Sequence, residues 1–108
     1  MKNIELTVIH DEKEYVFSGE GDVVFISYSM PLIDCFMENK IDPSSKKLVK
    51  VNVINGFGEY ARKQQKMFKI HDKCTLKVND DFYTGEYATW SRIDGQPLII
   101  VDNSNRLP

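Results

Sequence analysis

Apolar and polar residues alternate in several short runs along this chain. The alternation is clearest over residues 4–8 and 49–53, where every second residue is Ile, Leu or Val. A period of two is typical of a strand with one buried face. Residues 23–26 form a continuous apolar run, which indicates a strand buried on both faces. We therefore predict strands over residues 4–8, 15–17, 23–26, 49–53, 74–78, 82–90 and 98–101.

The period changes to that of a helix after residue 29. Leu32, Ile33 and Phe36 recur at helical spacing, and Pro31 suits a first turn, where its missing N–H has no partner to lose. This pattern predicts a short helix over residues 31–39. Residues 58–69 also favour a helix, whereas residues 67–70 resemble the start of a strand. We expect a helix and then a strand in this segment.

Turn residues divide the last third of the chain into three strands. Asn79, Asp80 and Asp81 follow the first strand, and Asp94 with Gly95 suits a tight turn with positive φ at the glycine. These turns predict a β-meander. The expected fold class is mainly β, with some α+β character: a small β-barrel or rolled antiparallel sheet with one or two short helices, in one domain of residues 1–108.

Composition supports one hydrophobic core. The 108 residues are 42% hydrophobic, and no apolar run approaches the length of a membrane span. Since the N-terminus turns polar too early for a signal peptide, we expect a cytoplasmic protein with no membrane partner. Cys35 and Cys74 are expected to be free, buried thiols. The excess of Lys over Arg, with abundant Ile and Asn, suggests a low-GC bacterium or a mobile element.

The residues that commonly carry catalysis are few and scattered. His10 and His71 belong to no nucleophile, metal or phosphate motif. Asp72 and Cys74 lie beside His71, but zinc sites use about four ligands, so a turn before a strand explains the group better. We expect no enzymatic activity, metal or cofactor.

Charge is distributed unevenly along the chain. The net charge is −2, yet residues 46–77 hold nine basic residues against Glu59 and Asp72. This segment either forms a positive patch or is neutralised by the acidic residues between Glu5 and Asp22. Aromatic residues interleave with the basic ones, a mixture suited to base stacking and phosphate attraction. The candidate nucleic-acid-binding residues are Lys50, Phe57, Tyr60, Arg62, Lys63, Lys66 and Lys69.

One short motif lies in this segment. Gly56, Phe57 and Gly58 resemble the aromatic strand motif of RNA-recognition and cold-shock domains. Asn55 stands where those families place Lys or Arg, and Glu59 stands where they place an aromatic residue. The resemblance therefore transfers no binding role to this chain.

A second candidate surface lies in the segment 82–90. Tyr83, Tyr87 and Thr89 alternate with a face that carries Phe82 and Trp90. If the Phe82 and Trp90 face is core, the tyrosine face is a partly exposed aromatic strip of the kind enriched at protein interfaces. If a helix covers the tyrosine face, it forms a second core layer.

These observations favour a non-enzymatic binding module that regulates or inhibits a partner protein through Tyr83, Tyr87 and Thr89. The alternative is a regulator that binds RNA or single-stranded nucleic acid through residues 46–77.

Overall fold

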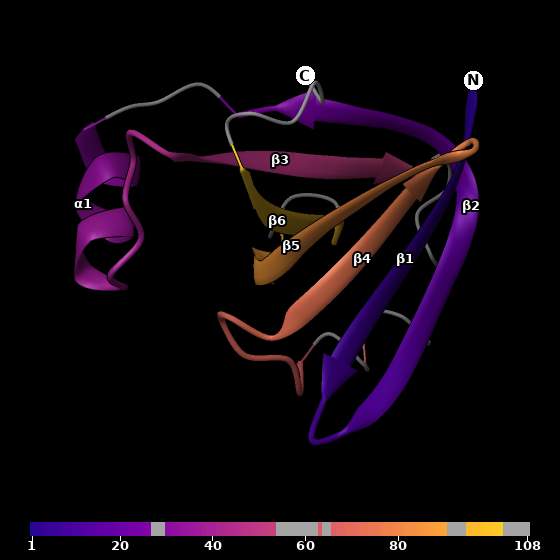
Figure 1. Ribbon diagram of the computed structural model, residues 1–108, viewed down its shortest axis with the longest axis horizontal. Helices are drawn as coiled ribbons and strands as arrows, with labels where there is room; N and C mark the ends of the chain where they lie inside the picture. The colour runs from indigo at the N-terminus through magenta and orange to yellow at the C-terminus, as the bar shows by residue number, and fades with distance from the viewer. Residues whose placement is uncertain (27–29, 54–62, 64–65, 91–94, 103–108) are drawn as a thin grey trace.

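Within the described residues, the fold is a closed barrel of six antiparallel strands, with the short helix α1 beside it (Figure 1). The computed structural model describes residues 1–26, 30–53, 63, 66–90 and 95–102. The mainly β class predicted from the alternation is confirmed. The elements are β1 (Lys2–His10), β2 (Lys13–Phe25), α1 (Met30–Glu38), β3 (Lys46–Val53), β4 (Lys73–Val78), β5 (Asp81–Trp90) and β6 (Pro97–Asp102).

The strands follow the order β1-β2-β3-β6-β5-β4 around the barrel, and β4 pairs with β1 to close it. The predicted meander is confirmed, because β4, β5 and β6 are successive neighbours. The connection between β3 and β4 spans residues 54–72 and brings the meander back against both β3 and β1. This arrangement is a Greek key closed into a ring.

Strand β2 bends so that it joins two parts of the barrel. Its first half pairs with β1 as far as Gly21, and from Gly21 onward it pairs with β3. A Cβ atom at Gly21 would overlap the carbonyl oxygen of Asn52, and one at Gly19 would overlap the side chain of Val53. The prediction of two separate strands over 15–17 and 23–26 was wrong here, since the glycines bend one strand instead of ending it.

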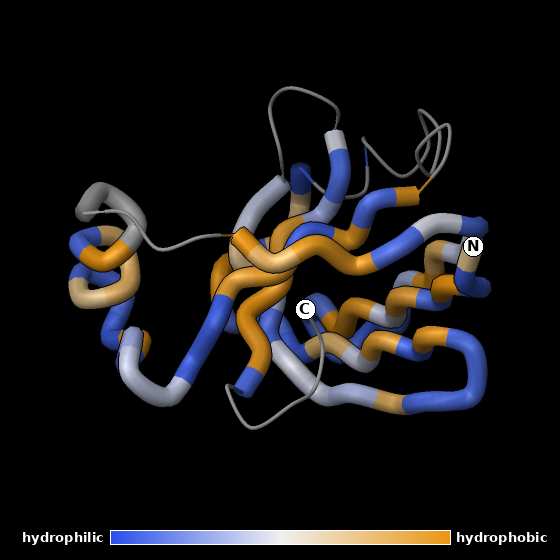
Figure 2. The backbone as a smooth tube through the Cα atoms, turned by 90° about the horizontal axis from the view of Figure 1, so that it is seen from above, coloured by the Kyte–Doolittle hydropathy of each residue, from blue (hydrophilic) through white to orange (hydrophobic). Residues whose placement is uncertain are grey.

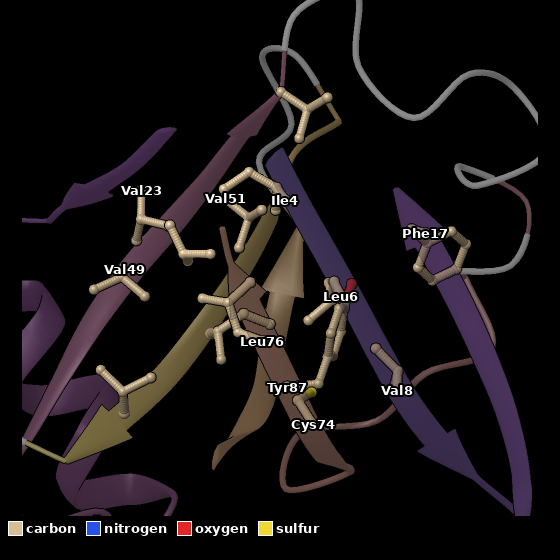
Figure 3. Close-up of a cluster of buried hydrophobic side chains, with 14 of the residues drawn as sticks. Ile4, Leu6, Val8, Phe17, Val23, Val49, Val51, Cys74, Leu76 and Tyr87 are labelled. Carbon is tan, nitrogen blue, oxygen red and sulfur yellow. The ribbon is translucent and has the colours of Figure 1, made fainter. Parts of the chain in front are cut away.

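Alternate residues of the strands point into the barrel, with one interruption in β5. Figure 3 shows Ile4, Leu6 and Val8 of β1 facing Leu76 of β4 and Tyr87 of β5. The backbone coloured by hydropathy alternates along the same strands (Figure 2). Burial of this interior supplies most of the favourable free energy of folding.

The helix forms a smaller apolar cluster outside the barrel. Phe36 of α1 packs with Ile41, Leu48 and Ile100, and each of these four side chains is buried. The helix ends at Glu38, in agreement with the helical spacing over 31–39. Within the described residues, no helix has the length and hydrophobicity to cross a membrane.

The end of β3 is completed by a side chain from a distant loop. Gln96, 4% exposed, donates from Nε2 to the Val53 carbonyl (2.8 Å) and accepts from the Val53 N–H at Oε1 (3.3 Å). The amide thus takes the place of a neighbouring strand's backbone. Gly95, just before it, has a φ of 73°, as the turn chemistry predicted. Asp94 lies outside the described residues.

Two predictions about the β3–β4 connection and the thiols need correction. Residues 67–70 form no strand; Lys66 N–H donates to the Lys63 carbonyl in a turn, and β4 begins only at Lys73. Both cysteines are free, but Cys35 is exposed on α1 and only Cys74 is buried.

Candidate functional site

The prediction of a partly exposed strip of Tyr83, Tyr87 and Thr89 is wrong for Tyr87. Tyr87 is 1% exposed and lies in the barrel core, and Tyr83 is partly buried against that core. Burial raises the pKa of the Tyr87 hydroxyl, as do the nearby Cys74 and Asp72. Of the three predicted residues only Thr89 is exposed. The inner face of β5 is therefore the tyrosine face, and Phe82, 67% exposed, lies on the outer face.

A β-bulge explains why Thr89 and Tyr87 do not share a face. The register of β5 against β6 shifts between Tyr87 and Thr89, so Ala88 is an extra residue. Tyr87 is opposite the buried Ile99, whereas Thr89 is opposite the outward Leu98. The bulge turns the rest of the strand over, and a uniform period of two cannot predict it.

One end of the barrel is filled by Phe68, from the described part of the β3–β4 connection. Phe68 is 8% exposed and packs edge-on against Tyr15, Phe17 and Tyr87, with ring centroids 5.3, 6.0 and 5.3 Å away. Aromatic pairs in this geometry add to the stabilisation from burial alone. Phe68 lies among the basic residues that were expected to bind nucleic acid, but its ring belongs to the core.

The two histidines hold the same end of the barrel together. His10 Nδ1 lies 2.8 Å from Asp72 Oδ2, which also accepts the Lys69 N–H at 2.9 Å. His71, at a φ of 77°, lies 2.8 Å from Glu86 Oε1 through Nδ1 and 3.0 Å from the Asn39 carbonyl through Nε2. These bonds tie the loop before β4 to β1, β5 and the end of α1.

The thiol near these histidines is held in its neutral form. Burial raises the pKa of Cys74 to about 12, and the charges of Asp72 and Glu86 add to the shift. Its Sγ donates to the Asp72 carbonyl at 3.5 Å. A thiol in this state is a poor nucleophile and a poor metal ligand at neutral pH. Among the described residues, no group of three or more His, Cys, Asp and Glu is placed to hold a metal ion.

The structure divides the predicted basic segment among several elements. Lys50 lies on the outer side of β3, between Val24 and Leu98 on the neighbouring strands. Lys63, Lys66 and Lys69 are exposed in the β3–β4 connection. Phe57, Tyr60 and Arg62 lie outside the described residues, so the structure does not show whether the seven candidates meet.

Two other lysines are paired with acids. Lys46 lies 3.6 Å from Asp102, and Lys2 lies 3.2 Å from Asp22. A hydrogen bond from the Val23 N–H, and then Lys2, lowers the pKa of Asp22. The first residues of β3 and β1 are therefore locally neutralised.

The outer face of β2, β1, β4 and β5 carries an uncharged row, the threonine row: Val16, Thr7, Thr75 and Thr84. These four residues lie directly opposite one another across four neighbouring strands. Val16 is 55% exposed, and Thr84 is also exposed. The row carries no charge, and depletion of charged residues is a feature of interface centres.

The next row of outward-facing residues on the same four strands includes an exposed aromatic ring. Ser18, Glu5, Lys77 and Phe82 occupy that row, one from each strand in the same order. Lys77 Nζ lies 5.4 Å from the centroid of the Phe82 ring. Outside this pair, 67% of Phe82 faces solvent. Phe82 is therefore the exposed aromatic group of this face, and the threonine row lies beside it.

A shallow groove extends from the threonine row towards β6. Its volume is about 640 Å³, and its lining includes Ile9, Thr75, Thr84, Glu86 and Ile100. Sequence reasoning missed this face because it took the Phe82 side of β5 as core. No signal in the sequence finds it, because the register that aligns Thr7, Thr75 and Thr84 follows from the strand order.

Comparison with known proteins adds one partial likeness. The chain is 30% identical over 105 residues to Protein FAM83D from Bos taurus, an alignment that covers 90% of this chain but 18% of that protein. The chain thus spans less than a fifth of that relative. No protein-family model matches the chain, and no solved structure matches it.

Proposed function

We propose that this chain is a non-enzymatic protein-binding module that regulates or inhibits a partner protein by covering part of its surface. The binding face is the threonine row together with Phe82. The observation that carries the proposal is the 67% exposure of Phe82 beside four uncharged, in-register residues on a folded barrel. Leaving such a ring in water is unfavourable, and a partner surface would bury it.

Tyr83, Tyr87 and Thr89, the residues first predicted to bind the partner, are not part of the proposed face. Tyr87 is withdrawn from it, because its ring packs inside the barrel. Tyr83 and Thr89 stay outside the proposed face, since one packs on the core and the other follows the bulge. The proposal moves the site from the tyrosine side of β5 to its outer side.

The test compares two faces of the barrel. Immobilised wild-type protein is expected to capture a defined partner from an extract of its source cells, and Phe82→Ala with Thr84→Glu should abolish capture. Val24→Ala is the matched control, because Val24 is 42% exposed on the outer side of β2, where that strand pairs with β3. Equal capture by both variants would refute the face, and absence of a partner bound by the wild type would refute the function.

The second candidate function is binding of single-stranded nucleic acid through the basic segment. It is supported by the exposure of Lys63, Lys66 and Lys69 on one connection. Each phosphate contact would contribute a slope of about −0.7 to the plot of log affinity against log salt. Lys63→Glu with Lys66→Glu should then abolish an oligonucleotide gel shift, whereas Phe82→Ala should leave it unchanged.

A further inference from the structure

The charges on the proposed binding face are arranged in a self-complementary order. Glu5 of β1 lies directly opposite Lys77 of β4. Thr7, the next outward-facing residue of β1, lies opposite Thr75 of β4. A two-fold axis that runs parallel to β1 and β4, midway between them, would relate two copies face to face. Each β1 residue of one copy would then lie over its cross-strand partner on β4 of the other copy. Glu5 would then meet Lys77 twice, once on each side of the axis.

We propose that the occupant of this face in the free protein is a second copy of the same chain, in a two-fold dimer with Glu5 and Lys77 paired across the axis. The inference rests on the proposed function, since it uses the same face. It specifies how that face is regulated: a partner protein would have to displace the second copy.

Glu5 and Lys77 of the same chain do not form an ion pair with each other. Among the ion pairs of the described residues none joins Glu5 to Lys77, although the two are cross-strand neighbours. Lys77 Nζ lies instead over the Phe82 ring. Glu5 is exposed on the outer face of β1. Opposite charges across an interface fix its register and suppress other pairings.

The same axis would bring uncharged residues together beside the central pair and acids together at both rims, where Glu20 would approach Asp80 at one end. Phe82 and Ser18 of the second copy, like Val16 and Thr84, would lie at the edges of the contact, because β5 and β2 curve away on either side of β4 and β1. Glu86 would approach an acid, Glu14, at the other end, but it already bonds with His71 at 2.8 Å. Repulsion there is reduced by that bond and by solvent.

The convex shape of a barrel limits the area that two copies can bury. We therefore expect an interface at the low end of the specific range, below about 1,200 Å² in total, and a weak dimer. Sedimentation equilibrium over roughly 5–500 μM is expected to show a reversible shift from the mass of one chain to twice that mass. The dimer fraction should fall as salt is raised, because exposed ion pairs are screened.

Charge reversal identifies the contact. Glu5→Lys and Lys77→Glu should each be monomeric, since both pairs across the axis become like-charged. An equimolar mixture of the two variants should regain the wild-type dimer fraction, because every pair across the axis is then opposite in charge. The neighbours within each chain stay like-charged in the mixture, so recovery reports only contact between chains.

Matched controls carry the same charge changes elsewhere. Glu38→Lys on α1 and Lys66→Glu in the β3–β4 connection lie at exposed positions off the face and should dimerise as the wild type does. Circular dichroism checks that every variant is folded. A monomeric wild type throughout the range, or a mixture that stays monomeric, would overturn the dimer. Either result leaves the capture experiment with Phe82→Ala to decide the proposed function separately.

Discussion

At the scale of single residues, the buried amide of Gln96 shows how one side chain can complete a strand. Its two polar atoms bond with the N–H and the carbonyl of the same residue, Val53. Both groups of the backbone would otherwise be buried without a partner, which costs about 1–3 kcal/mol for each group.

Gln96→Glu is therefore expected to destabilise the barrel. A carboxylate cannot donate to the Val53 carbonyl, and it adds a buried charge, so the free energy of unfolding should fall by roughly 2–4 kcal/mol. Urea denaturation measures the change. Asn52→Asp is the control: Asn52 is exposed on the same strand, and a loss as large as that of Gln96→Glu would show that the buried contact is not responsible.

The raised pKa of Cys74 predicts that the stability of the protein depends on pH. Its pKa is raised from 9.0 to about 12 in the folded protein, so the unfolded state loses this proton first. The thiol contributes full stability below pH 9, and that contribution falls as the pH rises from 9 towards 12. Cys74→Ala should show a smaller loss of stability over this window in thermal melts; an identical slope in both proteins would contradict the prediction.

Labelling distinguishes the two thiols directly. Iodoacetamide at pH 8 should modify one thiol in the native protein, the exposed Cys35, and both after denaturation. Mass spectrometry gives the count. Rapid modification of native Cys74 would show that the barrel opens locally at β4.

At the scale of elements, Phe68 decides the stability of the connection between β3 and β4. Phe68→Ala removes a ring that contacts Tyr15, Phe17 and Tyr87, and should lower the free energy of unfolding by about 3–5 kcal/mol. Met67→Ala is the control, since the adjacent Met67 is 41% exposed. Comparable losses from both variants in urea denaturation would show that the ring does not close the barrel end.

The elements also show which parts of the fold the sequence reveals. Residues 4–8 and 49–53 keep a strict period of two because one of their faces is buried and the other is wet, so their prediction as strands was confirmed. The segment 82–90 was misread because its outer face carries Phe82 and its inner face carries Gly85, which reverses the usual distribution.

A glycine is needed at residue 85 because of a close contact that the sequence alone does not reveal. A Cβ atom there would lie 2.6 Å from the Ile100 carbonyl oxygen, on the neighbouring strand β6. Which strand neighbours β5, and how closely, depends on closure of the ring. The candidate site was therefore beyond sequence reasoning, whereas the strand and helix pattern was within it.

At the scale of the whole molecule, closure of the ring joins the chain's first strand to its fourth. β1 pairs with β2 along its full length and with β4 from Ile4 to Val8. Removing residues 1–10 should leave β2 and β4 with unpaired backbone edges and abolish cooperative unfolding, as followed by far-UV circular dichroism. A truncated chain that still melts in one sharp transition would contradict this.

This closure has a consequence for the order of events during synthesis on the ribosome. The β1–β2 hairpin emerges before β4, the second partner of β1, which begins only at Lys73. Until then the nascent chain presents an open strand edge, the kind of edge that pairs with other chains. Glu5 and the acidic residues of the hairpin, from Asp11 to Glu14, lie along that edge or next to it. Their negative charge would keep unfinished chains on one polysome from pairing with each other before the barrel can close.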